Sequence, residues 1–199
     1  MTTKDNTQFA DKVIETLRKA ATEIEEFQVQ AALGKAEAED KYEELKKKFD
    51  LFIHDSKFKM KEGKEKMDGV NTKLDELRVQ LALGKAESLD AFKAQKKKLL
   101  LKLHELEVEI KTNETLNRMY AFVLLEIEKF RVNLEVIEQK FGEGKKESKT
   151  SFEKGKKEFN QFIDNFKNKY GKKKETKWEH FQGEISEAFD HLKHAFTKP

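Results

Sequence analysis

Histidine and glutamate side chains near the C-terminus form the arrangement in this sequence best suited to metal chemistry. On a helix that turns ~100° per residue, the five residues of this set fall within about 40° of one line: His180, Glu184, Glu187, His191 and His194. Imidazole nitrogens and carboxylate oxygens one turn apart are ligands that Zn²⁺ takes. The same line borders the apolar face, where polar flanking residues are ordinary, and no second cluster supplies partners. We therefore predict no metal site and keep Glu187, His191 and His194 as candidate ligands.

Other catalytic patterns fail on their spacing. None of the five histidines follows a glutamate by three positions, as di-iron helical bundles require. The run Gly142-Glu143-Gly144-Lys145 lacks the upstream glycine and the hydroxyl residue of a phosphate-binding loop. The absence of cysteine excludes thiolate ligands and disulfides. Because no nucleophile and base can be paired from these residues, we predict that the protein is not an enzyme and carries no cofactor.

Lysine is concentrated in the C-terminal third of the chain. Between Lys140 and Lys177, thirteen lysines stand against six acidic residues. Such blocks ordinarily form solvated helix faces. The alternative is adsorption to an anionic membrane or inclusion surface, because interfacial helices pair an apolar face with a lysine-rich one. Candidate residues for surface binding are Lys145, Lys146, Lys156, Lys157, Lys172, Lys173 and Lys174. With only four arginines in the chain, nucleic-acid readout is not expected.

Amphipathic helices must position these side chains. The only proline is the last residue, Pro199, and apolar residues recur at steps of three and four in stripes beginning near Phe9, Leu74 and Leu116, with a last stripe from Trp178. This pattern predicts an all-α protein, an elongated antiparallel bundle or coiled coil of four helices, with three very long helices as the alternative. We expect breaks near 62–70, 111–116 and 170–174. Residues 111–117 fit either a turn or a continuous helix with buried asparagines.

One sequence motif occurs in three copies, near 27–53, 77–103 and 137–163. We expect all three copies to lie in a single elongated domain over 1–199. The second copy lies fifty residues after the first, and the third lies sixty residues after the second. Gly34, Gly84 and Gly144 hold the same position in each copy and fall on the apolar stripe. We therefore predict that all three lie inside helices and permit close helix packing.

These features favour a non-enzymatic scaffold or protein-interaction protein that associates with itself or with another helical protein. The alternative is peripheral binding to an anionic surface through the lysine- and phenylalanine-rich third. Basic antiparallel bundles of this size resemble BAR domains and phasins in architecture, although no motif identifies either family. The N-terminal residues lack the apolar core of a signal peptide, so we expect a cytoplasmic protein.

Overall fold

The computed structural model describes residues 3–30, 35–61, 68–111, 121–141, 157–161, 163–165, 168, 187–188 and 190–191. Every residue in these ranges is helical except for the turn 82–88, which confirms the all-α class. The chain divides into two compact units, Met1–Gln30 with Gly144–Pro199, and Ala31–Glu143. The prediction of a single elongated domain over residues 1–199 concerns how these units are arranged, and it stays a prediction.

The first unit contains α1 (Thr3–Gln30). Its buried residues Val13, Leu17, Ala20 and Ile24 follow the predicted steps of three and four. In the C-terminal part of this unit, Phe159, Ile163 and Ala188 are buried. The prediction of a helix through Gly34 concerns residues outside the described ranges, because α1 ends at Gln30 and the next helix begins at Lys35.

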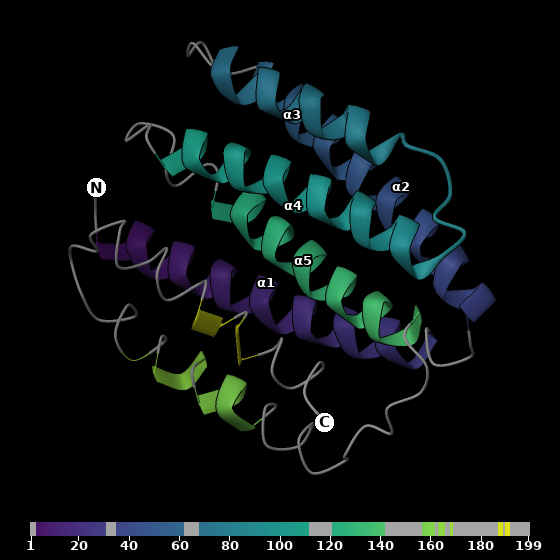
Figure 1. Cartoon of the computed structure of the whole chain (residues 1–199). Helices are drawn as coiled ribbons and strands as arrows, with labels where there is room; N and C mark the ends of the chain where they lie inside the picture. The colour runs from purple at the N-terminus through teal and green to yellow at the C-terminus, as the bar shows by residue number, and fades with distance from the viewer. Residues whose placement is uncertain are drawn as a thin grey trace. The chain divides into compact units, whose positions relative to one another are not determined.

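The second unit contains α2 (Lys35–Lys61), α3 (Asp68–Leu81), α4 (Leu89–Lys111) and α5 (Ala121–Phe141). Helix α2 packs against α3 and α5, and α4 packs against the same two helices (Figure 1). No backbone contact joins α2 to α4, so these two helices lie diagonally opposite each other. The longest described helix is α1, with 28 residues.

Ion pairs fix an antiparallel register between α2 and α3. Arg78 Nε lies 2.6 Å from Asp50 Oδ1, and Lys57 Nζ lies 2.5 Å from Asp75 Oδ1. As residue numbers rise along α2, those of the partners on α3 fall. The two helices therefore run antiparallel, and we call this pair the α2–α3 hairpin.

The apolar stripes predicted from the sequence form the core of this unit. Helix α3 buries Val70, Leu74, Leu77 and Leu81. The rings of Tyr42 on α2 and Phe92 on α4 meet edge to face with centroids 5.0 Å apart. These two residues hold the same position in the first and second copies of the repeat. Equivalent residues of the two copies therefore contact each other in the core of the unit. Other equivalent buried positions are Phe49, Leu99 and Phe159, and Ile53, Leu103 and Ile163.

The prediction that Gly84 lies inside a helix is wrong. The turn 82–88 separates α3 from α4, and Ala91 N donates a hydrogen bond to Ser88 Oγ at 3.1 Å, which caps the start of α4. A Cβ built on Gly84 would meet no atom within 4 Å, so the close helix packing expected there is also wrong. At Gly69 on α3, by contrast, a Cβ would lie 2.1 Å from Oε1 of the Glu109 side chain on α4.

The helix predictions at Gly34 and Gly144, and the three predicted helix breaks, fall largely outside the described ranges. Gly34 and Gly144 lie outside the described ranges, as do the breaks expected at 111–116 and 170–174 except for Lys111 at the end of α4. Of the break expected near 62–70, residues 68–70 already belong to α3, and the rest falls outside those ranges.

Candidate interaction surface

A buried lysine on α2 holds the turn that follows α3. Lys46 is 2% exposed, and its Nζ donates to the carbonyl oxygen of Leu83 at 2.7 Å and of Gly84 at 3.5 Å. Glu43 Oε1 lies 2.7 Å from the same nitrogen, and the Tyr42 ring lies 4.7 Å from it. Backbone carbonyl groups in a turn lack the donors that a helix supplies and need other partners. The ammonium group therefore satisfies carbonyl groups of the turn that follows α3 and ties this turn to α2.

A second set of hydrogen bonds ties the turn to α4. Gln95 Nε2 donates to the carbonyl oxygen of Gly84 at 2.8 Å, and Tyr42 Oη donates to Gln95 Oε1 at 3.0 Å. Burial, together with the nearby Glu43 charge, raises the pKa of Tyr42 above its ordinary value. The phenol therefore stays protonated and remains a donor. Through these contacts the turn is bonded to both α2 and α4.

The same repeat position holds a buried lysine on α4. Lys96 corresponds to Lys46 and pairs with Glu135 Oε1 at 2.7 Å and with Glu138. The following lysines of each run, 47–48 and 97–98, are exposed. The first lysine of each of these two runs is therefore buried, because folding brings acceptor oxygens to its ammonium group.

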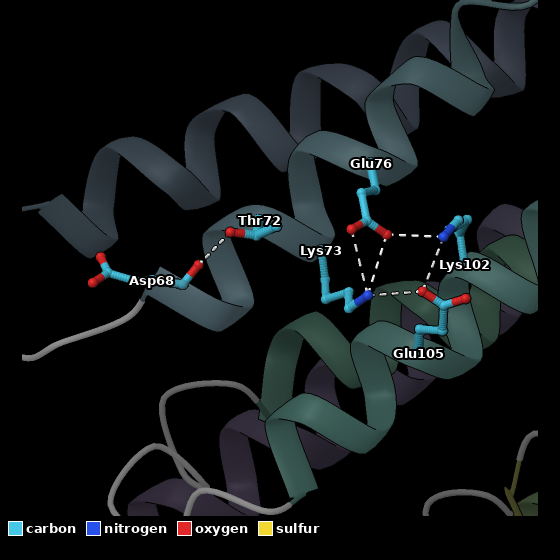
Figure 2. A network of polar contacts seen from close by, with 6 residues as sticks. All are labelled: Asp68, Thr72, Lys73, Glu76, Lys102 and Glu105. Carbon is cyan, nitrogen blue, oxygen red and sulfur yellow. Dashed lines mark hydrogen bonds and ion pairs between the residues drawn. The ribbon is translucent and has the colours of Figure 1, made fainter.

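A four-membered ion network joins α3 to α4. Figure 2 shows Lys73 and Glu76 on α3 facing Lys102 and Glu105 on α4. Lys73 Nζ lies 2.9 Å from Glu105 Oε2, and Lys102 Nζ lies 2.8 Å from Glu76 Oε2. Hydrogen bonds from both lysines hold the pKa of Glu76 and of Glu105 below its ordinary value. The network sets the antiparallel register of this pair, with residue numbers falling on one helix as they rise on the other.

Two large apolar side chains are exposed on the α2–α3 hairpin. Leu51 is 63% exposed and Val79 is 64% exposed. They directly follow Asp50 and Arg78, which face each other across the hairpin. On each helix the next residue is rotated by ~100° about the helix axis. Because the two helices run in opposite directions, these rotations carry both side chains to the same outer side of the pair. Leu51 and Val79 therefore lie at one level on one face, and we call this face the hairpin patch.

Exposed apolar positions recur with the repeat. Val79 corresponds to Val29, and Leu51 corresponds to Leu101, fifty residues away in each case. All four side chains are exposed. Sequence reasoning missed them because it followed only the buried stripe. The available signal was the recurrence of apolar residues off that stripe in successive copies.

The predicted site residues are only partly placed. Lys157 is exposed, while Lys145, Lys146, Lys156, Lys172, Lys173 and Lys174 lie outside the described ranges. His191 Nε2 lies 3.9 Å from Glu187 Oε1, and His191 Nδ1 lies 3.7 Å from Glu158 Oε2. His194 is outside the described ranges. The described residues contain no group of three His, Cys, Asp or Glu side chains that could hold a metal ion.

Comparison of the chain with family models, with curated proteins and with solved structures gives no match. None of the described helices has both the length and the apolar character needed to cross a bilayer.

Proposed function

We propose that the protein is a non-enzymatic helical scaffold of the cytoplasm that associates with itself through the hairpin patch. The observation that supports this proposal is the exposure of Leu51 and Val79 at one level of the α2–α3 hairpin. Their neighbours on the outer side of these helices are polar or charged, including Lys47, Asp55 and Asp75. Covering the two side chains with a second copy removes apolar area from water, which favours association.

The charges around Leu51 suit a symmetric dimer. Lys47 lies one turn before Leu51, Asp55 lies one turn after it, and both are exposed. In a two-fold dimer every contact is made twice. When the two-fold axis of the dimer runs perpendicular to α2 through the level of Leu51, Lys47 of each copy approaches Asp55 of the other copy. The two α2 helices then pair antiparallel in the manner of a coiled coil, supported by the bundle of α2–α5.

Light scattering coupled to size-exclusion chromatography tests this proposal. We expect the full chain to dimerise at high micromolar concentration and the Val79→Glu and Leu51→Glu variants to be monomeric, because each places a carboxylate in the patch. Leu101→Glu is the matched control, since it changes an equally apolar, exposed side chain on the diagonal helix. A monomeric parent, or equal dimerisation of all variants, would contradict the proposal.

Adsorption to an anionic surface is the second candidate function. It is favoured by the thirteen lysines against six acids between Lys140 and Lys177. Co-sedimentation with vesicles containing phosphatidylserine measures it at low and high salt. Electrostatic adsorption weakens as salt rises, because screening shortens the range of the attraction.

A further inference from the structure

The outer side of α4 carries a second exposed seam with the spacing of a coiled coil. Its members follow one another at steps of three and four along one line of the helix: Ala94, Lys97, Leu101, His104 and Val108. All five are exposed, with Leu101 at 57% and Val108 at 45%. Leu101 and Val108 are seven residues apart, so both would contact the same face of a partner helix. We call this line the α4 seam.

Exposed positive charges lie beside the N-terminal half of the α4 seam, whereas Glu105 and Glu107 beside its C-terminal half are paired with lysine or arginine side chains. Lys93 and Lys98 flank it, and Lys97 belongs to it. No ion pair among the described residues uses these three lysines, whereas Lys96 and Lys102 on the same helix bond to carboxylates. Asp90, at the start of the helix, is the only exposed acid of α4. In coiled coils the residues beside the seam select the partner by charge.

We infer that the α4 seam binds an acidic amphipathic helix of a partner protein, with apolar residues on its contact line and glutamate or aspartate beside it. The inference rests on the proposed scaffold function and names the class of partner that the scaffold holds. Leu101 and Val108 supply the apolar contacts, and the three lysines attract the flanking carboxylates. A second copy of α4 fits the seam less well, because it would set lysines against lysines. A bilayer fits less well too, because interfacial helices bury a wider apolar face.

The equivalent line on α2 provides an internal comparison. Lys47, Leu51 and His54 correspond to Lys97, Leu101 and His104, and all are exposed. At the N-terminal end, however, Glu43 and Glu44 replace Lys93 and Ala94. Glu43 pairs with Lys46 and Glu44 pairs with Lys41 and Lys48, so this end of α2 carries less unpaired positive charge than the equivalent end of α4. The α4 seam is therefore the preferred of the two sites for an acidic helix, although the repeat supplies both with the same central residues.

Fluorescence anisotropy with a designed peptide tests the inference on the full chain. The probe is a labelled 21-residue helix with leucine on the contact line and glutamate on both flanks, and the control peptide carries lysine in place of glutamate. We expect saturable binding of the acidic peptide, at least tenfold weaker binding of the basic one, and at least tenfold weaker acidic-peptide binding by Leu101→Glu. Val79→Glu, matched in chemistry and exposure, should bind like the parent. Circular dichroism confirms that both variants remain folded.

The outcomes separate this inference from the self-association proposal. A Val79→Glu chain that is monomeric and still binds the peptide supports both proposals. A parent that is monomeric but binds the acidic peptide through Leu101 supports the seam and overturns self-association. Absence of saturable binding to 100 µM peptide at low salt, equal binding of both peptides, or no effect of Leu101→Glu would overturn the seam. Vesicle binding that depends on Leu101 without peptide binding would assign the seam to lipid and also overturn it.

Discussion

Replacing Lys46 by methionine tests whether the buried ammonium group holds the turn that follows α3. Methionine keeps the length and most of the packing of the lysine stem but cannot donate a hydrogen bond. The variant therefore leaves the carbonyl oxygen of Leu83 without its donor at 2.7 Å and Glu43 without the cation at 2.7 Å. The Tyr42 ring, 4.7 Å from the nitrogen, would contact a thioether instead.

The expected loss follows from opposing contributions. A hydrogen bond from a charged donor stabilises a fold by roughly 1.5–3 kcal/mol, and the buried acceptor left behind adds a desolvation penalty of similar size. Methionine offsets part of this loss, because burying an ammonium group is itself unfavourable. We expect the free energy of unfolding to fall by about 2 kcal/mol. With a urea dependence of roughly 1–3 kcal/mol per molar, the unfolding midpoint should fall by about 1 M.

Urea titration followed by circular dichroism measures this midpoint. Lys47→Met is the matched control, because Lys47 is the next residue on α2 and is exposed. Its substitution should change the free energy of unfolding by no more than about 0.5 kcal/mol. Equal midpoints for the two variants would refute the assignment of Lys46 as the residue that holds the turn after α3. A higher midpoint for Lys46→Met would show that the cost of burying the charge exceeds the value of its bonds.

Three further predictions concern the turn and the charges. Ser88→Ala should lower the free energy of unfolding by about 1 kcal/mol while Ser88→Asp preserves it, since aspartate also caps helices; thermal melts distinguish them. Gly84→Ala should raise the free energy of unfolding by roughly 0.4–1 kcal/mol, because space is open there and the unfolded chain loses freedom; a lower melting temperature would contradict the open turn. Hydrogen bonds from Lys41 and Lys48 lower the pKa of Glu44 to about 2, so the stability that its carboxylate contributes is present above the ordinary value of 4.5 and is lost as pH falls toward 2. The difference in melting temperature between parent and Glu44→Gln should therefore vanish near pH 2, and a difference that persists there would exclude this ion pair as its source.

The all-α class and most of the buried residues of the described helices could be predicted from residue spacing alone. Steps of three and four placed Tyr42, Phe92 and Phe130 in the core, because a helix brings such positions to one side whatever its partners. The repeat likewise predicted equivalent buried positions, such as Phe49 and Leu99. These inferences depend only on local helix geometry and on the removal of apolar area from water.

Only the tertiary structure decided where the helices end and which polar groups are buried. The turn 82–88 spans seven residues, close to two turns of a helix at 3.6 residues each, so the apolar spacing stays in phase across it and periodicity gives no sign of a break. Lys46 and its exposed neighbour Lys47 are the same residue type in one charged run. Folding separates them, because the turn that follows α3 brings backbone carbonyl groups to the side of α2 that carries Lys46. The level pairing of Leu51 and Val79 likewise depends on the α2–α3 register, which ion pairs between distant residues set.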